Sequence, residues 1–191
     1  METETIYGQL ARLFEYPGED YVARARSCAE RMRREQSDEI PEAAVLLEAF
    51  STAIQDLGAD ELQELFTRTF DLNPVCSLEI GWHLYGEEYQ RGEFLVKMRQ
   101  QLRARDLPES GELPDHLTHA LALLDRMEPE EASEFASHCL LPALDKMRAG
   151  WQKNHNAYWP LLESLFALLK SRYTYQPLQH LVRVPELRVI E

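Results

Sequence analysis

The sequence predicts an all-α protein, folded as one helical bundle of about eight helices. Apolar residues recur every three or four positions along most of the chain, as at Leu10, Leu13 and Phe14, which is the spacing of one face of an amphipathic helix. Strand-like alternation and a repeat of fixed length are not found. A chain of 191 residues can bury one sizeable core, so we expect one domain over residues 1–176 and a tail over 177–191.

Turn residues divide the periodic segments from one another. Tyr16-Pro17-Gly18 ends the first helix, and Leu72-Asn73-Pro74 interrupts the chain after the fourth. The expected helices of this half span residues 6–14, 21–34, 41–58 and 60–70.

Residues 77–105 are helical in character, with Ser77 as the expected cap, but they contain Gly81, Gly86 and Gly92. Each glycine should cost roughly 1 kcal/mol relative to alanine inside a helix. Three of them therefore predict a bend or the close approach of another backbone.

The C-terminal half continues the helical pattern. After a loop at 107–111, a helix is expected to begin at Pro114, followed by helices over 130–154 and 157–173. Pro142 is placed to kink or split the first of these two. The tail over 177–191 is expected to be extended or disordered, and it is a candidate for docking on a partner.

The charge and composition narrow the classes of partner. Lys and Arg number 20 against 33 Asp and Glu, so the formal net charge is −13. This charge repels nucleic acid and attracts a cationic peptide. The first residues lack the basic and apolar regions of a secretion signal, and no window approaches the ~20 apolar residues of a membrane span. The cysteines Cys28, Cys76 and Cys139 are widely spaced. We expect a cytoplasmic protein without stable membrane insertion.

Residues that could carry chemistry form no strong pattern. His116 and His119 share a helix face, and Glu112 or His83 could complete a zinc site, but no His-Glu-x-x-His is present. The alternative is that His116 caps or packs the helix start and that His119 is solvated. Nucleophile elbows and phosphate loops are absent, and Cys76 has no base beside it. We predict no enzyme, no catalytic or metal residue and no cofactor of the protein's own; cofactor-binding residues stay unknown.

Recognition of a peptide suits the remaining residues better. Trp82, Tyr85 and Tyr89 place aromatic rings at near-helical spacing around Gly81 and Gly86. The alternative is that the rings belong to the core. Acidic side chains nearby could receive lysine or arginine from a peptide, or could simply be a solvated helix face. These acids are Asp71, Glu87, Glu88 and Asp115. Arg91 is expected to pair internally with one of them and hold the bend.

The same segments resemble the nitrate reductase delta subunit family (NarJ-type), within the class of all-helical redox-enzyme maturation chaperones. The resemblance covers most of residues 6–170. It is carried by Leu10-x-x-Leu13-Phe14-Glu15-Tyr16-Pro17, Phe70-Asp71, Ser77-Leu78, His83-Leu84-Tyr85-Gly86-Glu87, Arg91-Gly92 and Glu112-Leu113-Pro114-Asp115-His116-Leu117. The last string contains the Glu-x-Pro-Asp-His motif of the wider class. Asn73-Pro74 and Gly81-Trp82-His83 are more similar to a subgroup than to the best-known nitrate reductase members. The client expected from this difference is a nitrate reductase or a relative, such as a dehydrogenase or another oxyanion reductase.

The resemblance implies a cytoplasmic chaperone that binds the N-terminal segment of a molybdoenzyme catalytic subunit. It would keep this client competent for molybdenum cofactor insertion before membrane docking or export, and cofactor delivery proteins are further candidate partners. The rival functions are a structural adaptor or permanent subunit of a redox complex, and a metal-dependent hydrolase. The expected peptide-binding residues are Trp82, His83, Tyr85, Gly86, Glu87, Glu88, Tyr89, Arg91, Glu112, Asp115 and His116.

Overall fold

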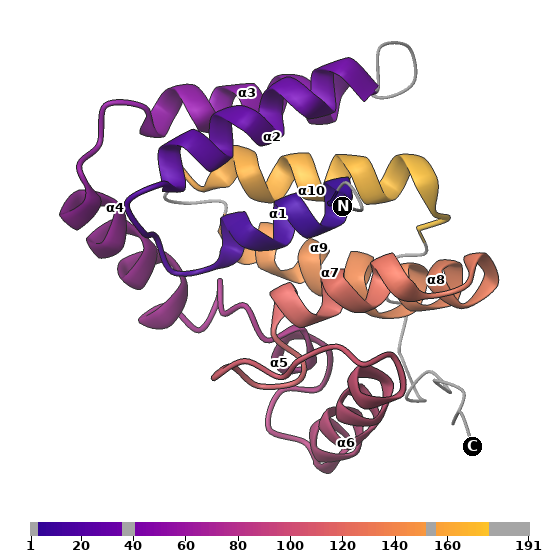
Figure 1. Ribbon diagram of the computed structural model, residues 1–191. Helices are drawn as coiled ribbons and strands as arrows, with labels where there is room; N and C mark the ends of the chain where they lie inside the picture. The colour runs from indigo at the N-terminus through magenta and orange to yellow at the C-terminus, as the bar shows by residue number, and fades with distance from the viewer. Residues whose placement is uncertain (1–3, 36–40, 152–155, 176–191) are drawn as a thin grey trace.

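A computed structural model describes residues 4–35, 41–151 and 156–175 of the chain. Every regular element in these ranges is a helix, which confirms the all-α class (Figure 1). The α-helices are α1 (Ile6–Ala11), α2 (Tyr21–Glu35), α3 (Pro41–Ile54), α4 (Ala59–Phe66), α5 (Ile80–Tyr85), α6 (Tyr89–Ala104), α7 (Leu117–Arg126), α8 (Pro129–Phe135), α9 (Leu141–Gly150) and α10 (Trp159–Arg172). The 3-10 helix η1 (Arg12–Phe14) and the π-helices η2 (Thr67–Asp71) and η3 (Ala136–Leu140) join some of them. The tail over 177–191 lies outside the described residues.

Amphipathic faces of the longer helices meet in a single core. Helix α3 packs against both α2 and α10, and α1 packs against α7. In Figure 1, α2 and α3 lie above α10, whereas α5 and α6 form a smaller part at the other side of α7. Aromatic rings from distant segments meet in the core, for example Tyr21, Phe50 and Tyr158. In the described part of the chain, no helix is both long and apolar enough to cross a membrane.

The predicted helix over 77–105 is two helices. Helix α5 ends at Gly86, whose φ of 61° is a backbone conformation in which a residue with a side chain would be strained. Helix α6 starts three residues later, at Tyr89. The cap of α5 is Glu79, so the expectation of a cap at Ser77 is wrong by two residues. The predicted bend lies at Gly86, whereas the atoms that crowd Gly81 belong to the side chains of Asp115 and Phe94 and not to another backbone.

Two other predicted boundaries also move. Helix α7 begins at Leu117 with His116 as its cap, and not at Pro114, because the residues before it form a bridge to the start of α5. The predicted helix over 130–154 is split into α8 and α9 by the π-turn η3, directly before Pro142. Proline cannot donate the backbone hydrogen bond that a continuous α-helix needs, so the widened turn stands where the sequence predicted a kink.

Helix α5 is held at both ends by groups from other helices. At its start, the main chain pairs with the residues before α7: Ile80 N–H donates to Asp115 O (3.0 Å) and Leu117 N–H donates to Leu78 O (2.8 Å). At its end, Lys146 of α9 donates to the carbonyl of His83 at 2.6 Å. A helix of six residues is too short to be stable alone, so these contacts determine where it lies.

A pair of glycine substitutions tests this packing. A Cβ added at Gly81 would lie 2.5 Å from Asp115 Oδ2 and 2.9 Å from Phe94 Cδ1, whereas one added at Gly92 would meet nothing within 4 Å. We expect Gly81→Ala to lower the free energy of unfolding by about 2 kcal/mol through overpacking. Gly92→Ala should raise it by about 0.7 kcal/mol, because alanine is the better helix former. Denaturant unfolding measures both, and a Gly81→Ala variant as stable as Gly92→Ala would contradict the close approach.

Candidate functional site

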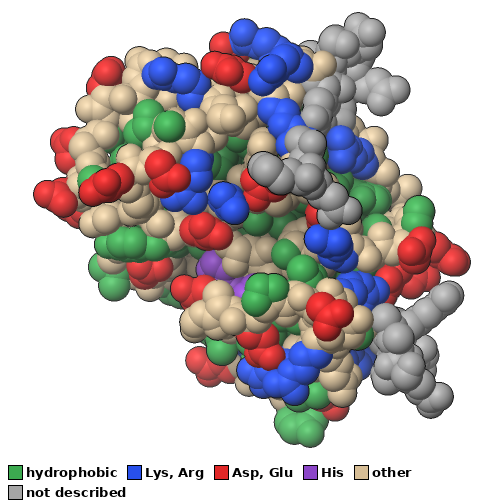
Figure 2. All heavy atoms as spheres, viewed as in Figure 1, with side chains coloured by type: hydrophobic (Ala, Val, Ile, Leu, Met, Phe, Trp, Pro, Cys, Tyr) green, Lys and Arg blue, Asp and Glu red, His purple; other side chains and the backbone are tan. Residues whose placement is uncertain are grey.

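A groove of about 1210 Å³ crosses the face of the protein between the η1 side and the α5–α6 part. Figure 2 shows the hollow with histidine at its bottom and acidic side chains along its edges. Several stretches of chain contribute to it: α1 and the turn after it, η2 and the residues after it, the approach to α5, α5 and α6, the loop before α7, and α7 itself. Lining residues include Arg12, Glu15, Tyr16, Phe70, Asp71, Leu72, Ser77, Glu79, Trp82, Arg91, Leu107, Glu112, His116, His119 and Arg126.

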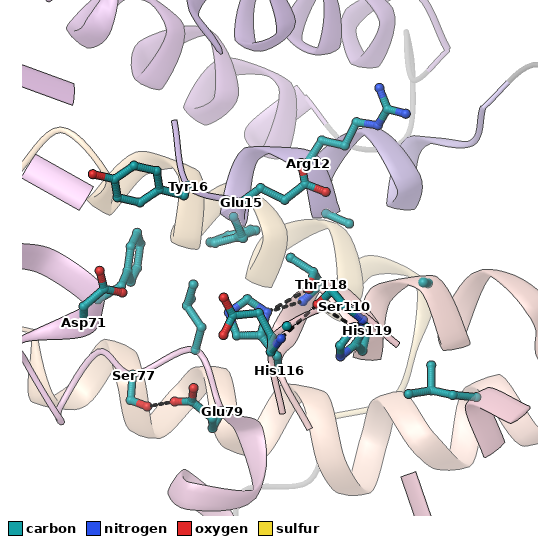
Figure 3. A pocket seen from close by; sticks show the side chains of 18 of the residues that line it. Arg12, Glu15, Tyr16, Asp71, Ser77, Glu79, Ser110, His116, Thr118 and His119 are labelled. Atoms are coloured by element: carbon teal, nitrogen blue, oxygen red, sulfur yellow. Dashed lines mark hydrogen bonds between the residues drawn. The ribbon is translucent and has the colours of Figure 1, made fainter. Parts of the chain in front are cut away.

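The floor of the groove is a network of neutral histidines at the start of α7 (Figure 3). Ser110 N–H donates to His119 Nε2 at 3.1 Å, so His119 carries its proton on Nδ1 and donates it to Leu113 O at 2.9 Å. Thr118 N–H approaches His116 Nδ1 at 3.4 Å, which makes this ring the N-cap of α7. Burial lowers the pKa of His116 to about 4. The His116 ring is therefore uncharged at neutral pH, and its expected capping role is confirmed.

Carboxylates gather on the wall formed by η1, η2 and the approach to α5. Figure 3 shows Glu15, Asp71 and Glu79 around the same half of the groove as Tyr16. Glu15 is paired with Arg24 at 3.3 Å, and Glu79 accepts a hydrogen bond from Ser77 Oγ. Asp71 forms no ion pair within the described ranges. This half of the groove can receive a cation.

Apolar side chains lie exposed beside these acids. Tyr16 is 55% exposed and Leu72 is 75% exposed, although both are large and both line the groove. Tyr16 is held edge-on to Phe66 with ring centroids 5.6 Å apart. Exposed apolar groups that rim a hollow indicate a surface that binds another molecule.

Trp82 and Arg91 form the wall from the α5–α6 side. The indole N–H of Trp82 donates to Pro74 O at 3.0 Å, and the Arg91 guanidinium lies 5.6 Å from the centre of its ring. Arg91 Nε also lies 3.9 Å from Asp115 Oδ2, which matches the expectation that Arg91 pairs internally. The aromatic surface at this wall is thus fixed by polar contacts on both sides.

Asp115 differs from its expected role as a receiver of peptide cations, because its side chain is 0% exposed. Its Oδ2 accepts the backbone N–H of Gly81 at 3.0 Å, and its Oδ1 has no partner in the described part of the chain. Burial raises the pKa of this carboxyl to about 6, and the nearby Arg91 guanidinium opposes that rise. The Asp115 carboxylate lies at the N-terminus of α5, where the helix dipole favours a negative charge.

Of the eleven predicted peptide-binding residues, the structure places four on the groove: Trp82, Arg91, Glu112 and His116. His83 is buried beneath it, with Nε2–H donating to Ser77 O at 2.6 Å, and Tyr85 packs on Phe94. The remaining turn residues Glu87, Glu88 and Tyr89 are exposed, next to Gly86 and outside the groove lining. Their part in binding stays a prediction.

The sequence reasoning did not select Glu15, Tyr16, Leu72 or Glu79 as site residues. Tyr16-Pro17 predicts a helix end, and the same residues belong to the segments that carry the family resemblance. Leu72-Asn73-Pro74 predicts an interruption of the helical pattern after Asp71. A large apolar residue in a polar turn was the available signal, and it pointed to an exposed rim.

The residues considered for a zinc site do not assemble into one. Across the described ranges, no three His, Cys, Asp or Glu side chains come together in a group that could hold a metal ion. Both ring nitrogens of His119 already have partners, Ser110 and Leu113. His119 is 6% exposed, so the alternative that it is solvated is wrong.

The fold and the groove define an all-helical protein with a peptide-sized cleft. Residues 34–163 match the nitrate reductase delta subunit family, and the chain belongs to that family. It is 28% identical over 161 residues to the nitrate reductase molybdenum cofactor assembly chaperone NarJ of Escherichia coli K12, covering 83% of this chain and 67% of that protein. The NarJ protein of Escherichia coli O157:H7 matches with the same identity and coverage.

The pKa of Asp115 makes a testable contribution to stability. Between about pH 4 and pH 6 the folded state keeps a proton on this carboxyl that the unfolded chain has lost, so this stabilisation disappears as pH rises through about 6. The shift corresponds to about 3 kcal/mol. Compared with wild type, Asp115→Asn should therefore gain in relative stability between pH 4 and pH 7.

Urea unfolding of both proteins across this range measures the effect. The lowered pKa of His116 acts in the opposite direction, but it is common to both proteins and cancels in the difference. Asp56→Asn, at an exposed position, is the matched control. A difference between wild type and Asp115→Asn that is constant with pH would contradict the burial of a charged Asp115.

Proposed function

We propose that this protein is an assembly chaperone for the catalytic subunit of a nitrate reductase or a related molybdoenzyme. It binds the N-terminal segment of that subunit in the groove and holds the client competent for molybdenum cofactor insertion. It acts in the cytoplasm, before the client docks at a membrane or is exported, and it catalyses no reaction itself. Family membership and the names of the two NarJ relatives support this function.

The size of the groove supports a peptide as the occupant. At about 1210 Å³ it exceeds the ~300–1,000 Å³ of typical small-molecule pockets. Figure 2 shows it as an open hollow on one face of the molecule. A helical segment laid into a groove, with apolar anchors at intervals of three and four residues, is a common mode of peptide recognition.

The chemistry of the groove selects an amphipathic, cationic segment. Tyr16, Leu72 and Trp82 offer apolar surface, and Asp71 and Glu79 offer negative charge beside it. The net charge of −13 assists the encounter with such a segment. A chaperone must release its client, so we expect a Kd of about 1 μM, equivalent to about −8 kcal/mol.

Calorimetry tests this function with a synthetic peptide of about the first 30 residues of the catalytic subunit of a nitrate reductase or related molybdoenzyme from the same organism. Leu72→Ser should weaken binding about tenfold, because an exposed apolar contact on the groove is lost. Val45→Ser is the matched control, since Val45 is 63% exposed on α3, away from the groove. Asp71→Asn should weaken binding about threefold at low salt and less at high salt, with Asp56→Asn as its control.

The same titration separates the groove from the turn at Gly86. We expect Glu87→Gln to reduce affinity less than Asp71→Asn, because Glu87 lies outside the groove lining. A larger effect at Glu87 would move the peptide site to the turn. Equal affinity of the Leu72→Ser and Val45→Ser variants would remove the groove from the proposal.

A further inference from the structure

We propose that Asp115 is a positioning residue for the peptide site: it touches no peptide, and it sets the place of Trp82 in the groove wall by holding the start of α5. The inference deepens the proposed function and rests on it. It differs from the expectation that Asp115 receives a cation from the peptide.

The first step is the hold of Asp115 on α5. The N-cap residue of this helix, Glu79, makes no side-chain capping bond. Asp115 supplies the missing acceptors instead: its carbonyl accepts Ile80 N–H and its Oδ2 accepts Gly81 N–H, both at 3.0 Å. These are the first two N–H groups of α5, which lack partners inside any helix. One residue from outside thus takes the place of an N-cap.

The second step is the fit at Gly81. The carboxylate lies so close to this backbone that a Cβ at position 81 would come within 2.5 Å of Oδ2. Only glycine leaves room for the oxygen to reach the N–H. The start of α5 is therefore shaped around this carboxylate. Loss of the side chain leaves the Gly81 N–H without its acceptor and opens a space for the helix to shift into, while Ile80 N–H keeps the Asp115 carbonyl.

The third step links α5 to the groove. Trp82 follows Gly81 directly and lines the groove, and its indole bonds to Pro74 O at 3.0 Å. Arg91 stacks on the Trp82 ring at 5.6 Å and lies 3.9 Å from Asp115 Oδ2. The Asp115 carboxylate thus holds the Trp82 indole in position in two ways. It bonds to the backbone of α5, and it lies beside the Arg91 guanidinium that contacts the indole ring.

Direct contact between Asp115 and a peptide is excluded by burial in this conformation. The side chain is 0% exposed, and the unpartnered Oδ1 is as inaccessible to solvent as Oδ2. A peptide group could reach Oδ1 only if α5 moved away. His116 and Trp82 line the groove, whereas Asp115 lies behind them and does not.

A double-mutant cycle separates positioning from direct contact. With the same synthetic peptide, we expect Asp115→Ala and Trp82→Ala each to weaken binding about tenfold. If Asp115 acts through Trp82, the double variant should bind the peptide no more weakly than the weaker of the two single variants. The reason is that each substitution removes the same contact, that of the Trp82 ring with the peptide. Independent losses that multiply to about a hundredfold would overturn the proposal.

A spectroscopic readout shows whether the indole has moved. The indole N–H resonance of Trp82, assigned with Trp82→Phe, should shift in free Asp115→Ala, while those of Trp151 and Trp159 in the other part of the fold stay in place. Asp115→Asn keeps an oxygen acceptor for Gly81 N–H, so it should restore the Trp82 resonance and most of the affinity. This variant also covers the case in which Asp115→Ala does not fold.

The outcomes are distinct. Binding weakened about tenfold with an unmoved Trp82 resonance, in either Asp115 variant, would make Asp115 a direct contact and overturn the proposal. A shifted resonance with unchanged affinity would also overturn it, since the wall would not matter for binding. Failure of wild type to bind the peptide would refute the proposed function, and an unshifted Trp82 resonance in Asp115→Ala would then still refute the positioning role.

Discussion

The pairing of the residues before α7 with the start of α5 is the contact on which the site depends. It joins two segments that are 34 residues apart at the Asp115–Gly81 hydrogen bond, and a bridge between Glu79 and His116 continues it. One side of this pairing becomes the N-cap of α7 and the floor of the groove, and the other becomes the wall that carries Trp82. Burying the Asp115 carboxylate costs free energy of desolvation. Hydrogen bonds and a nearby cation with good geometry must offset this cost.

The rest of the groove is built around that junction. The η1 side brings a tyrosine and a glutamate, η2 brings Asp71 on a widened helical turn, and α7 brings neutral histidines that leave the floor without charge (Figure 3). Charge therefore lies on the rim and apolar surface beside it. In the proposed function, this surface attracts a cationic segment and buries the apolar face of that segment.

The sequence was sufficient for what depends on local rules. Helical periodicity predicted the class and most helices, and the glycines predicted a bend, which lies at Gly86. At Gly81 the close neighbours are side chains and not the expected backbone. It was insufficient for what depends on long-range contact. Asp115 and Gly81 are 34 residues apart, and no sequence pattern connects them. The sequence therefore suggests that the Asp115 carboxylate binds a peptide cation, whereas in the structure it accepts a hydrogen bond from the start of α5. Tyr16 and Leu72 resemble ordinary turn residues until η1 and η2 are seen to meet.

Hydrogen–deuterium exchange of the protein, with and without the client's N-terminal peptide, tests the central claim most directly. If the groove holds the peptide, protection should rise in η2 and the residues that follow it to Trp82, and at the start of α7, while α2 and α3 stay unchanged. Protection confined to the α2–α3 face, with the groove segments exchanging as in the free protein, would contradict the account.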